Sequence, residues 1–350
     1  MKWPLASDIH TVSDTPSGVR TSDANNGGNE LSDSIKKLAL ETGFDLVGIT
    51  QLLPSKHSNY IREWFSDGKH GSMEYLQRHA PTKIDPQSHW PWVKSVIVLG
   101  LNYRPPASGT RPADGTGLQN GKIAAYAVGR DYHRVMAGLI KRLAAAIGAL
   151  RGQGYRWAAG VDTAPLLERE MATRAGLGWI GKNTMVINPK KGSWFVLGEL
   201  LTDLVLPSDL PMADHCGSCR RCIEACPTDA LTPYQMDARR CISYQLIENR
   251  GDITAALHQP IREAGFLVGC DICQVVCPHN SKAPVVNNPV WESAPVASMN
   301  LSDVAHWDEL AWDRQTRGRA TRRVKLPMWK RNAAILAGPT PTPATVSQND

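Results

Sequence analysis

The sequence predicts an α+β protein in which a larger α/β domain precedes a smaller, cysteine-rich domain. Three observations predict this fold. The chain has 350 residues, which is enough for two domains with sizeable cores. Apolar runs with helical and with strand spacing alternate up to about residue 210. All eight cysteines then lie between residues 216 and 277.

The first half of the larger domain contains a helix and two strands. Apolar residues recur at helical spacing over 31–39. The runs 44–50 and 94–103 are apolar and rich in β-branched residues, which favours buried strands. Residues 107–121 are rich in Gly, Pro, Asp and Thr, as is typical of an exposed loop.

The second half places one carboxyl residue at the end of a strand. An amphipathic helix over 133–150 is followed by a strand over 155–161, and that strand delivers Asp162 to its C-terminal end. Thr163 is expected to cap a helix that starts with Pro165. In an α/β layer, a carboxyl at this position points toward the place where ligands bind. The plainer interpretation of Asp162 is a helix cap.

The last part of this domain is predicted to be a pair of strands. These are the apolar runs 184–188 and 193–204. The glycines of 175–183 follow a helix and lack the dinucleotide-binding spacing, which excludes NAD binding there. Most of the eleven tryptophans are expected in the core.

The cysteine spacing predicts two iron–sulfur clusters. The first run reads C-x2-C-x2-C-x3-C-P, by which bacterial ferredoxins hold [4Fe–4S] clusters, with the fourth cysteine serving the other cluster. The second run, C-x2-C-x3-C-P, lacks its first cysteine, which Cys241 replaces. Cluster one is thus assigned to Cys216, Cys219, Cys222 and Cys277, and cluster two to Cys226, Cys241, Cys270 and Cys273. The alternatives are two zinc sites, which usually use separated C-x2-C pairs, or disulfides, which need an oxidising compartment.

Composition indicates a soluble, cytoplasmic protein. No run approaches the ~20 apolar residues of a membrane span, and no charged-then-apolar signal segment opens the chain. The net charge of +6 permits a polyanionic partner, although a solvated surface would look the same.

The expected organisation has five parts. They are a disordered extension over 1–29, the α/β domain over 30–210, the ferredoxin-like domain over 211–285, a basic C-terminal segment over 286–338 that packs on the first domain, and a disordered tail over 339–350.

Several motifs agree in order and spacing with one known family. They are G129-R-D-Y-H133, V161-D-T-A-P-L-L-E-R169, R174-A-G-L-G-W-I-G-K-N183, H215-C-G-S-C-R-R-C-I-E-A-C-P-T-D-A230, R240-C-I-S-Y244 and G269-C-D-I-C-Q-V-V-C-P278. With these motifs the chain resembles epoxyqueuosine reductases from about residue 31 to residue 338. The resemblance implies a cobalamin-dependent enzyme with two [4Fe–4S] clusters that reduces the epoxide of a modified base at the tRNA wobble position to an alkene, the last step of queuosine synthesis.

By this resemblance Asp162 matches the family's proton donor. Converting an epoxide to an alkene takes up two electrons and removes the oxygen as water, so the site needs a reductant and an acid. Cobalamin would carry the hard step and the clusters would feed it electrons. We expect burial beside the apolar cofactor to raise the pKa of this carboxyl.

The resemblance also implies a set of cobalamin contacts. Besides Asp162, the matching positions are Arg78, Ala124, Val186, Leu197, Thr202, Ser243 and Asp271. Several are small or apolar, as expected for a wall against a large flat cofactor, and ordinary core packing is the alternative. The chain has no D-x-H-x-x-G motif, so we expect no histidine below the cobalt.

The expected partners are tRNA and an electron donor. Eight Lys or Arg side chains between residues 314 and 331 suit the phosphates of an anticodon stem-loop, although basic stretches are more often solvated helix faces. We expect a monomer supplied by an external flavodoxin or ferredoxin system. Two other classes of protein would also be compatible with two iron–sulfur clusters. A reductive dehalogenase is disfavoured by the motifs around Asp162 and by the basic tail, and a plain electron-transfer ferredoxin module leaves the residues before the clusters unexplained.

Overall fold

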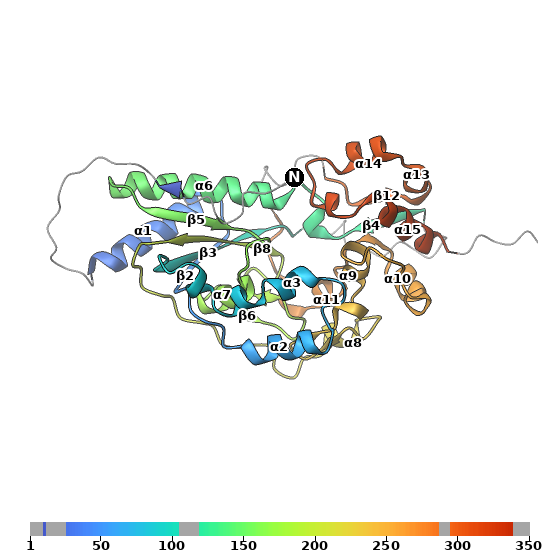
Figure 1. The fold of residues 1–350 in the computed structure, drawn as a ribbon, viewed down its shortest axis with the longest axis horizontal. Helices are drawn as coiled ribbons and strands as arrows, with labels where there is room; N and C mark the ends of the chain where they lie inside the picture. The colour runs from blue at the N-terminus through green and yellow to red at the C-terminus, as the bar shows by residue number, and fades with distance from the viewer. Residues whose placement is uncertain (1–9, 12–25, 105–118, 287–294, 339–350) are drawn as a thin grey trace, which may run out of the picture.

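The chain forms two main apolar cores that lie toward opposite ends of its long axis (Figure 1). The structure is a computed structural model and describes residues 10–11, 26–104, 119–286 and 295–338. The first core surrounds a five-stranded sheet, and the second surrounds a three-stranded sheet. No helix among these residues is long and apolar enough to cross a membrane.

The large sheet is antiparallel throughout. Its strands, in spatial order, are β1 (His10–Thr11), β5 (Arg156–Gly160), β8 (Phe195–Thr202), β3 (Ser95–Asn102) and β2 (Leu46–Thr50). All eight residues of β3 are buried, which explains its continuous apolar run. The expected mixture of helices and strands is present, although the strands of this sheet do not run parallel as they do in most α/β domains. The order of helices and strands along a chain does not fix strand direction, and here the connections return each strand antiparallel to its neighbour.

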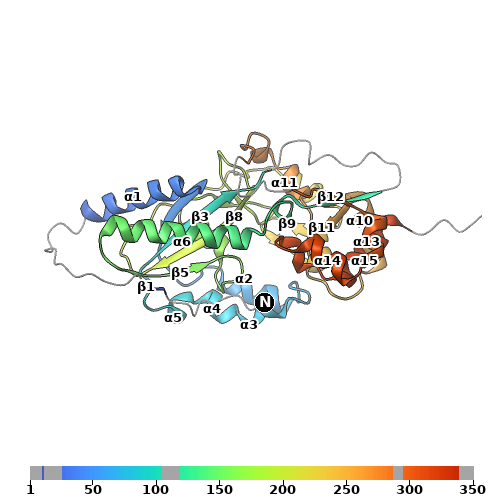
Figure 2. The same ribbon diagram turned by 90° about the horizontal axis from the view of Figure 1, so that it is seen from above.

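Helices cover both faces of this sheet. Helices α1 (Asn26–Thr42) and α6 (Tyr132–Arg151) lie together on one face, as Figure 2 shows, and α7 (Glu168–Arg174) lies on the other. Helix α6 begins where Asp131 Oδ1 accepts the backbone N–H of His133 at 3.1 Å and ends at Gly152, which has a left-handed φ of 64°. The predicted helix 133–150 is therefore confirmed, with both of its ends set by local chemistry.

Short elements connect the sheet to the rest of the chain. They are α2 (Ser58–Ser66), α3 (Glu74–Arg78), α4 (Ala80–Ile84), α5 (Pro86–His89), β6 (Trp179–Ile180) and β7 (Val186–Ile187). Strand β7 pairs with β6 rather than with β8, so the predicted pairing of 184–188 with 193–204 is wrong. Thr163 does not cap a helix either. Its hydroxyl donates to the carbonyl of Val161, and α7 begins only at Glu168.

The second core joins one early strand to the C-terminal segment. Strand β4 (Asn120–Ile123) pairs in parallel with β11 (Phe266–Val268) and antiparallel with β12 (Ser298–Asn300). The elements packed around this sheet are η2 (Ala125–Ala127), α9 (Ile242–Ile247), η4 (Ala255–Leu257), α10 (His258–Ala264), α13 (Leu301–His306), α14 (Glu309–Thr316), η6 (Ala320–Arg323) and α15 (Leu326–Ala337). The C-terminal segment thus packs on β4, which belongs to the predicted first domain, and on α9, α10 and β11, which follow the first run of cysteines.

The cysteine-bearing segment lies beside both cores. Its elements are α8 (Arg221–Glu224), β9 (Leu231–Thr232), β10 (Gln235–Met236), η3 (Ala238–Arg240), α11 (Ile272–Val275) and η5 (Pro278–Asn280). The two helices α8 and α11 contact each other.

The predicted extension over 1–29 is not structureless where it is described. Strand β1 pairs with β5, and α1 already begins at Asn26. The rest of that extension, residues 107–118 of the predicted loop and the predicted tail over 339–350 lie outside the described residues.

Candidate active site

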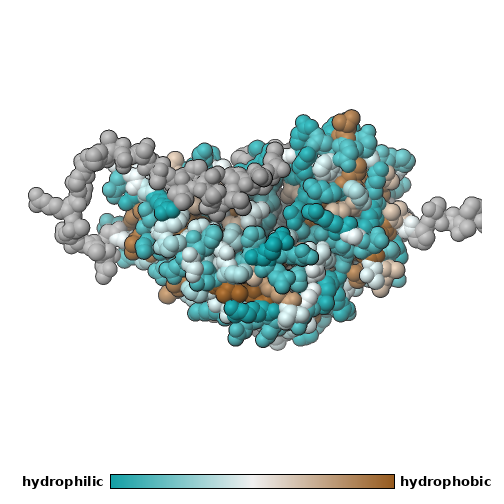
Figure 3. Space-filling view, in the orientation of Figure 1, coloured by the Kyte–Doolittle hydropathy of each residue, from teal (hydrophilic) through white to brown (hydrophobic). Residues whose placement is uncertain are grey.

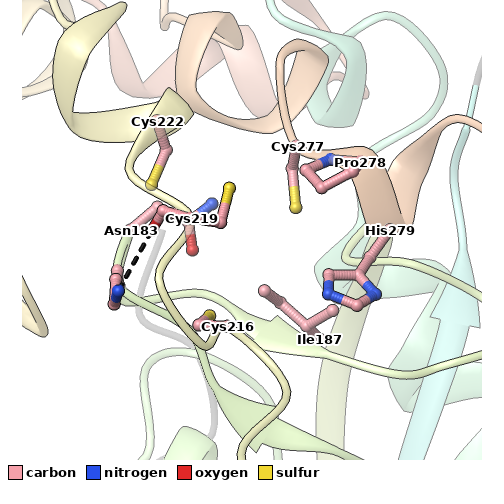
Figure 4. A pocket seen from close by; sticks show the side chains of 9 residues that line it. Asn183, Ile187, Cys216, Cys219, Cys222, Cys277, Pro278 and His279 are labelled. Carbon is pink, nitrogen blue, oxygen red and sulfur yellow. Dashed lines mark hydrogen bonds between the residues drawn. The ribbon is translucent and has the colours of Figure 1, made fainter.

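Four cysteines surround one space next to the sheet of β6 and β7. Cys216, Cys219, Cys222 and Cys277 line it together with Lys182, Asn183, Ile187, Pro278 and His279 (Figure 4). Lys182 Nζ donates to the backbone carbonyls of Gly217 and Cys219 at 2.5 and 3.0 Å, which ties the cysteine loop to the end of β6. This set coincides with the one assigned to cluster one from spacing.

The remaining four cysteines form a second group. The charges of Cys226, Cys241, Cys270 and Cys273 act on one another, and burial raises the pKa of Cys270 to about 12. None of the eight cysteines forms a disulfide. A metal that binds the buried group must displace protons from it, which couples metal uptake to proton release.

Two short helices place cysteines of the two runs at equivalent positions. This explains why the last cysteine of each run belongs to the group of the other run. Cys222 is the second residue of α8 and Cys273 is the second residue of α11, and four residues later each run ends in a Cys-Pro pair. Because α8 and α11 contact each other, the last cysteine of each run lies with the group that the other run begins. The long-range partner Cys241 directly precedes α9 and completes the second group.

Asp162 follows β5 in an unusual backbone conformation. Its φ is +53°, which non-glycine residues rarely adopt, and such conformations cost about 1–3 kcal/mol and concentrate at functional sites. The backbone N–H of Asp162 donates to Glu168 Oε1, and its carboxylate Oδ2 lies 3.2 Å from His133 Nε2. The side chain nevertheless remains 57 % exposed. The surroundings therefore fix this carboxylate but leave it accessible.

His133 links Asp162 to a second carboxylate. Its Nδ1 lies 2.7 Å from Asp131 Oδ1, so the ring bridges two acids. Burial opposes the charged ring, but the bonds to Asp131 and Asp162 prevail and raise the pKa of His133 to about 9. Burial alone would likewise raise the pKa of Asp162, yet the hydrogen bond and charge of His133 lower it below its ordinary value. Without a cofactor the imidazole thus outweighs burial, and a rise of this pKa beside bound cobalamin stays a prediction.

Three half-buried tyrosines and an arginine lie near enough to Asp162 for its charge to act on them. Burial raises the pKa of Tyr75 to about 12 and raises the pKa of Tyr126 and Tyr132 as well, and the charge of Asp162 acts on all three. The Arg323 guanidinium lies 5.5 Å from the centre of the Tyr75 ring, and the negative charge of Asp162 acts on it as well. These side chains come from α3, η2, α6 and η6, so Asp162 faces a region between the two cores.

The comparisons with known proteins identify the family. Residues 83–163 match the family model "Epoxyqueuosine reductase QueG, DUF1730", and residues 215–280 match "4Fe-4S double cluster binding domain". The epoxyqueuosine reductase of Synechococcus sp. (strain CC9605) is 39 % identical over 322 residues, covering 89 % of this chain and 96 % of that protein. The one from Escherichia coli (strain K12) is 36 % identical over 323 residues, covering 91 % and 83 %.

This chain belongs to the epoxyqueuosine reductase family.

Solved structures agree with this membership. The epoxyqueuosine reductase from Streptococcus thermophilus superposes with a TM-score of 0.73 at 30 % identity, covering 87 % of this chain and 80 % of that one. A crystal structure of an epoxyqueuosine reductase with an epoxyqueuosine-modified tRNA-Tyr stem loop gives a TM-score of 0.76 at 26 % identity, covering 88 % and 80 %. The match to a double 4Fe–4S domain also decides against the zinc and disulfide alternatives for the cysteines.

The positions that the epoxyqueuosine reductase resemblance assigned to cobalamin fall into separate places. Ala124 and Asp271 are neighbours in the second core, where Asp271 Oδ2 accepts the backbone N–H of Ala125 at 2.7 Å and burial raises the pKa of Asp271 to about 6. Val186 and Leu197 pack in one apolar cluster beside the large sheet. Ala124 and Asp271 thus lie at one apolar cluster, and Val186 and Leu197 belong to another. Residues that contact opposite sides of one large ligand would be divided in this way.

The other three positions differ in their exposure. The Arg78 side chain is 68 % exposed and lies 3.9 Å from Glu74. Ser243 is half-buried, and its backbone N–H bonds to Cys241. Thr202 is fully buried and pairs with Trp157, at the end of β5 far from Asp162, and its hydroxyl already accepts the N–H of Leu204 at 3.1 Å. Thr202 therefore lies toward the other end of the sheet from Asp162, and its part in cofactor binding stays a prediction.

Sequence reasoning missed the titratable groups that surround Asp162. His133 lies 29 residues before Asp162, in the motif G129-R-D-Y-H133, and nothing in that motif shows that its ring contacts the carboxylate. Glu199 is a carboxyl in the middle of the apolar strand β8, a pattern that could have been noticed as an ionisable residue in a buried run. Only the strand register places Glu199 next to Gly160, two residues before Asp162.

Proposed function

We propose that this chain reduces the epoxide of epoxyqueuosine at the tRNA wobble position to an alkene, which yields queuosine. The observation that carries the proposal is the accessible Asp162 carboxylate held by His133 in a chain of this family. The two cysteine groups support electron delivery through two [4Fe–4S] clusters, with the ligand sets assigned above. An external protein donor of the flavodoxin or ferredoxin class would supply the electrons.

The region that Asp162 faces fits cobalamin. Three half-buried tyrosines with raised pKa values mark weakly polar surroundings, while the exposed carboxylate leaves access for a large group. The cofactor would be held on one side by Asp162, Leu197 and Val186, beside the large sheet. On the other side it would meet Ala124, Ser243 and Asp271, at the second core, with Arg78 at the rim. When bound, cobalamin would supply a strongly reducing cobalt centre for opening the epoxide.

The residues of this chain would supply the acid. With the pKa of His133 at about 9, the ring is protonated at neutral pH, and Asp162 is ionised beside it. The His133–Asp162 pair therefore holds one proton, and Asp162 is the member that is exposed to a substrate. We propose that this proton passes through Asp162 to the departing epoxide oxygen, while Asp131 keeps the ring oriented.

The test is Asp162→Asn in cobalamin-loaded enzyme with both clusters. The variant should keep iron, cobalamin and tRNA binding and should lose turnover by about 10²-fold or more, the usual worth of a positioned acid. Asp203→Asn is the matched control, because Asp203 follows β8 at the sheet end that lies far from Asp162. Near-normal turnover in Asp162→Asn would remove Asp162 from the mechanism.

The tRNA surface is also proposed. A family member binds an epoxyqueuosine-modified stem loop, and the C-terminal basic stretch is the candidate region here. Arg322 and Arg323, the obvious pair in the sequence, have internal partners: Arg322 pairs with Asp313 at 2.7 Å, and Arg323 donates twice to Glu248 at 2.9 and 2.6 Å. Exposed Arg314 and Lys330 are therefore better candidates for phosphate contacts.

The domain division is also proposed. We propose a catalytic unit over residues 30–210, whose β4 and η2 pack with the C-terminal segment, and a cluster unit over 211–285. A monomer that acts on tRNA in the cytoplasm completes the proposal.

A further inference from the structure

Glu199 is a buried carboxyl whose hydrogen-bonding neighbour is another acid. It lies on β8 and is 0 % exposed, and among the described residues no N–H or hydroxyl group bonds to Oε1 or Oε2. The Glu168 carboxyl lies close enough to bond to it when one of the two acids carries a proton. Glu199 pairs in register with Gly160, and Oε2 lies 3.1 Å from where a β-carbon at residue 160 would be. Burying an ionised carboxylate in this way is very costly, so the group is expected to carry a proton.

Glu168 is the charged group that acts most strongly on Glu199. Burial, and then the charge of Glu168, raise the pKa of Glu199 well above its ordinary value. Burial, followed by the charge of Asp162, raises the pKa of Glu168 to about 7. Lys83 and Arg169 are the cations that face these acids, and Lys83 Nζ already donates to the carbonyl of Leu166 at 2.8 Å. Two neighbouring carboxyls therefore retain protons near neutral pH.

Glu168 connects this pair to the proposed proton donor. Its Oε1 accepts the backbone N–H of Asp162, so the three acids follow one another from the sheet interior to the exposed end of β5. Glu170, two residues further along α7, provides the contrast. It is also buried, but its carboxylate is bonded to Ser55 at 2.6 Å, to Lys56 N at 3.1 Å and to Arg174 at 2.5 Å.

The reaction needs more protons than the donor pair holds. Breaking both C–O bonds of the epoxide and releasing the oxygen as water takes up two electrons and two protons, and the external one-electron donor supplies the electrons. The His133–Asp162 pair holds one proton. We propose that Glu199 and Glu168 form a proton reserve: the Glu168 carboxylic acid gives its proton to the Asp162 carboxylate, which passes it to the oxygen, and Glu199 then returns a proton to Glu168. The bond from the Asp162 backbone N–H holds the Glu168 carboxyl in place and carries no proton itself. This inference rests on the proposed function.

The first experiment needs neither cobalamin nor tRNA. Infrared difference spectra recorded across a pH titration of the protein with its clusters should show a protonated carboxylic acid that persists above neutral pH. Its carbonyl band should be absent in Glu199→Gln and present in the control Glu170→Gln. An unchanged band in Glu199→Gln would overturn the proposal, whatever the activity of the enzyme.

The second experiment uses the loaded enzyme. Glu168→Gln keeps an oxygen that can accept the Asp162 N–H, so the loop can hold its shape. Wild-type turnover should fall as pH rises through about 7, where Glu168 loses its proton. Glu199→Gln and Glu168→Gln should each lower turnover at least tenfold above that pH, and small buffer acids should restore it, since either change breaks a relay. Full turnover in both variants across the pH range would overturn the reserve, whereas Asp162→Asn tests the donor separately.

Discussion

The unusual affinity of His133 for a proton can be tested before any cofactor is bound. A rise of its pKa from 6.5 to about 9 corresponds to about 3 kcal/mol of preference for the charged ring, at about 1.4 kcal/mol per pH unit. The two carboxylates should not contribute equally. Asp131 is 17 % exposed and lies 2.7 Å from the ring, whereas Asp162 is 57 % exposed and lies 3.2 Å away, where solvent screens it more.

The perturbations are Asp131→Asn and Asp162→Asn. Each removes one charge, and the amide oxygen that replaces the Asp131 carboxylate can still accept the N–H that begins α6. We expect the pKa of His133 to fall in both variants and to fall further in Asp131→Asn. The assay is an NMR titration of the imidazole C–H resonances, in which His133→Gln identifies the one signal of interest among ten histidines.

The same titration predicts a pH dependence of stability. Because folding raises this pKa, the pair stabilises the fold fully below pH 6.5, and this contribution is lost as pH rises through about 9. Chemical denaturation at several pH values should show this loss in the wild type and much less of it in His133→Gln. A His133 resonance that titrates near 6.5 in the wild type, or a larger fall in Asp162→Asn than in Asp131→Asn, would refute the reasoning.

Three further predictions follow from the cysteine groups, the second core and the basic segment. Cys241→Ser should lose one cluster and keep the other, so that iron per chain falls by about half; loss of both clusters would show that the two groups are not independent. Asn332 is fully buried and donates to the carbonyls of Leu246 and Leu267 at 3.0 Å each, so Asn332→Ala should lower the free energy of unfolding by about 1–3 kcal/mol in urea melts, and an unchanged midpoint would contradict this. The double variant Arg314→Glu/Lys330→Glu should weaken tRNA binding and flatten its salt dependence, and equal affinity at every salt concentration would move the tRNA surface elsewhere.

The face shown in Figure 3 is mostly hydrophilic, with small apolar areas. The largest exposures of apolar side chains among the described residues belong to Val205 and Leu210, on the segment that follows β8, and to Leu310 on α14. Scattered exposures of this kind are normal for a folded protein and need no partner.

The sequence by itself determined the features that depend on short-range spacing. Cysteine intervals followed by proline were enough to divide eight thiols into two groups, because two similar short helices place equivalent residues at equivalent positions. Apolar periodicity located α6 and β3, since burial of one helix face or of a whole strand leaves a pattern that is visible in a few turns.

Only the tertiary structure decided which distant residues meet at Asp162. Strand direction made the large sheet antiparallel, and the register of β5 with β8 placed Glu199 beside Gly160. The start of α6 brought His133 to the carboxylate, where its hydrogen bond and charge lower the pKa of Asp162. These outcomes depend on contacts between segments that local propensity does not specify, because a charge tens of residues away in the chain can be the nearest one in space.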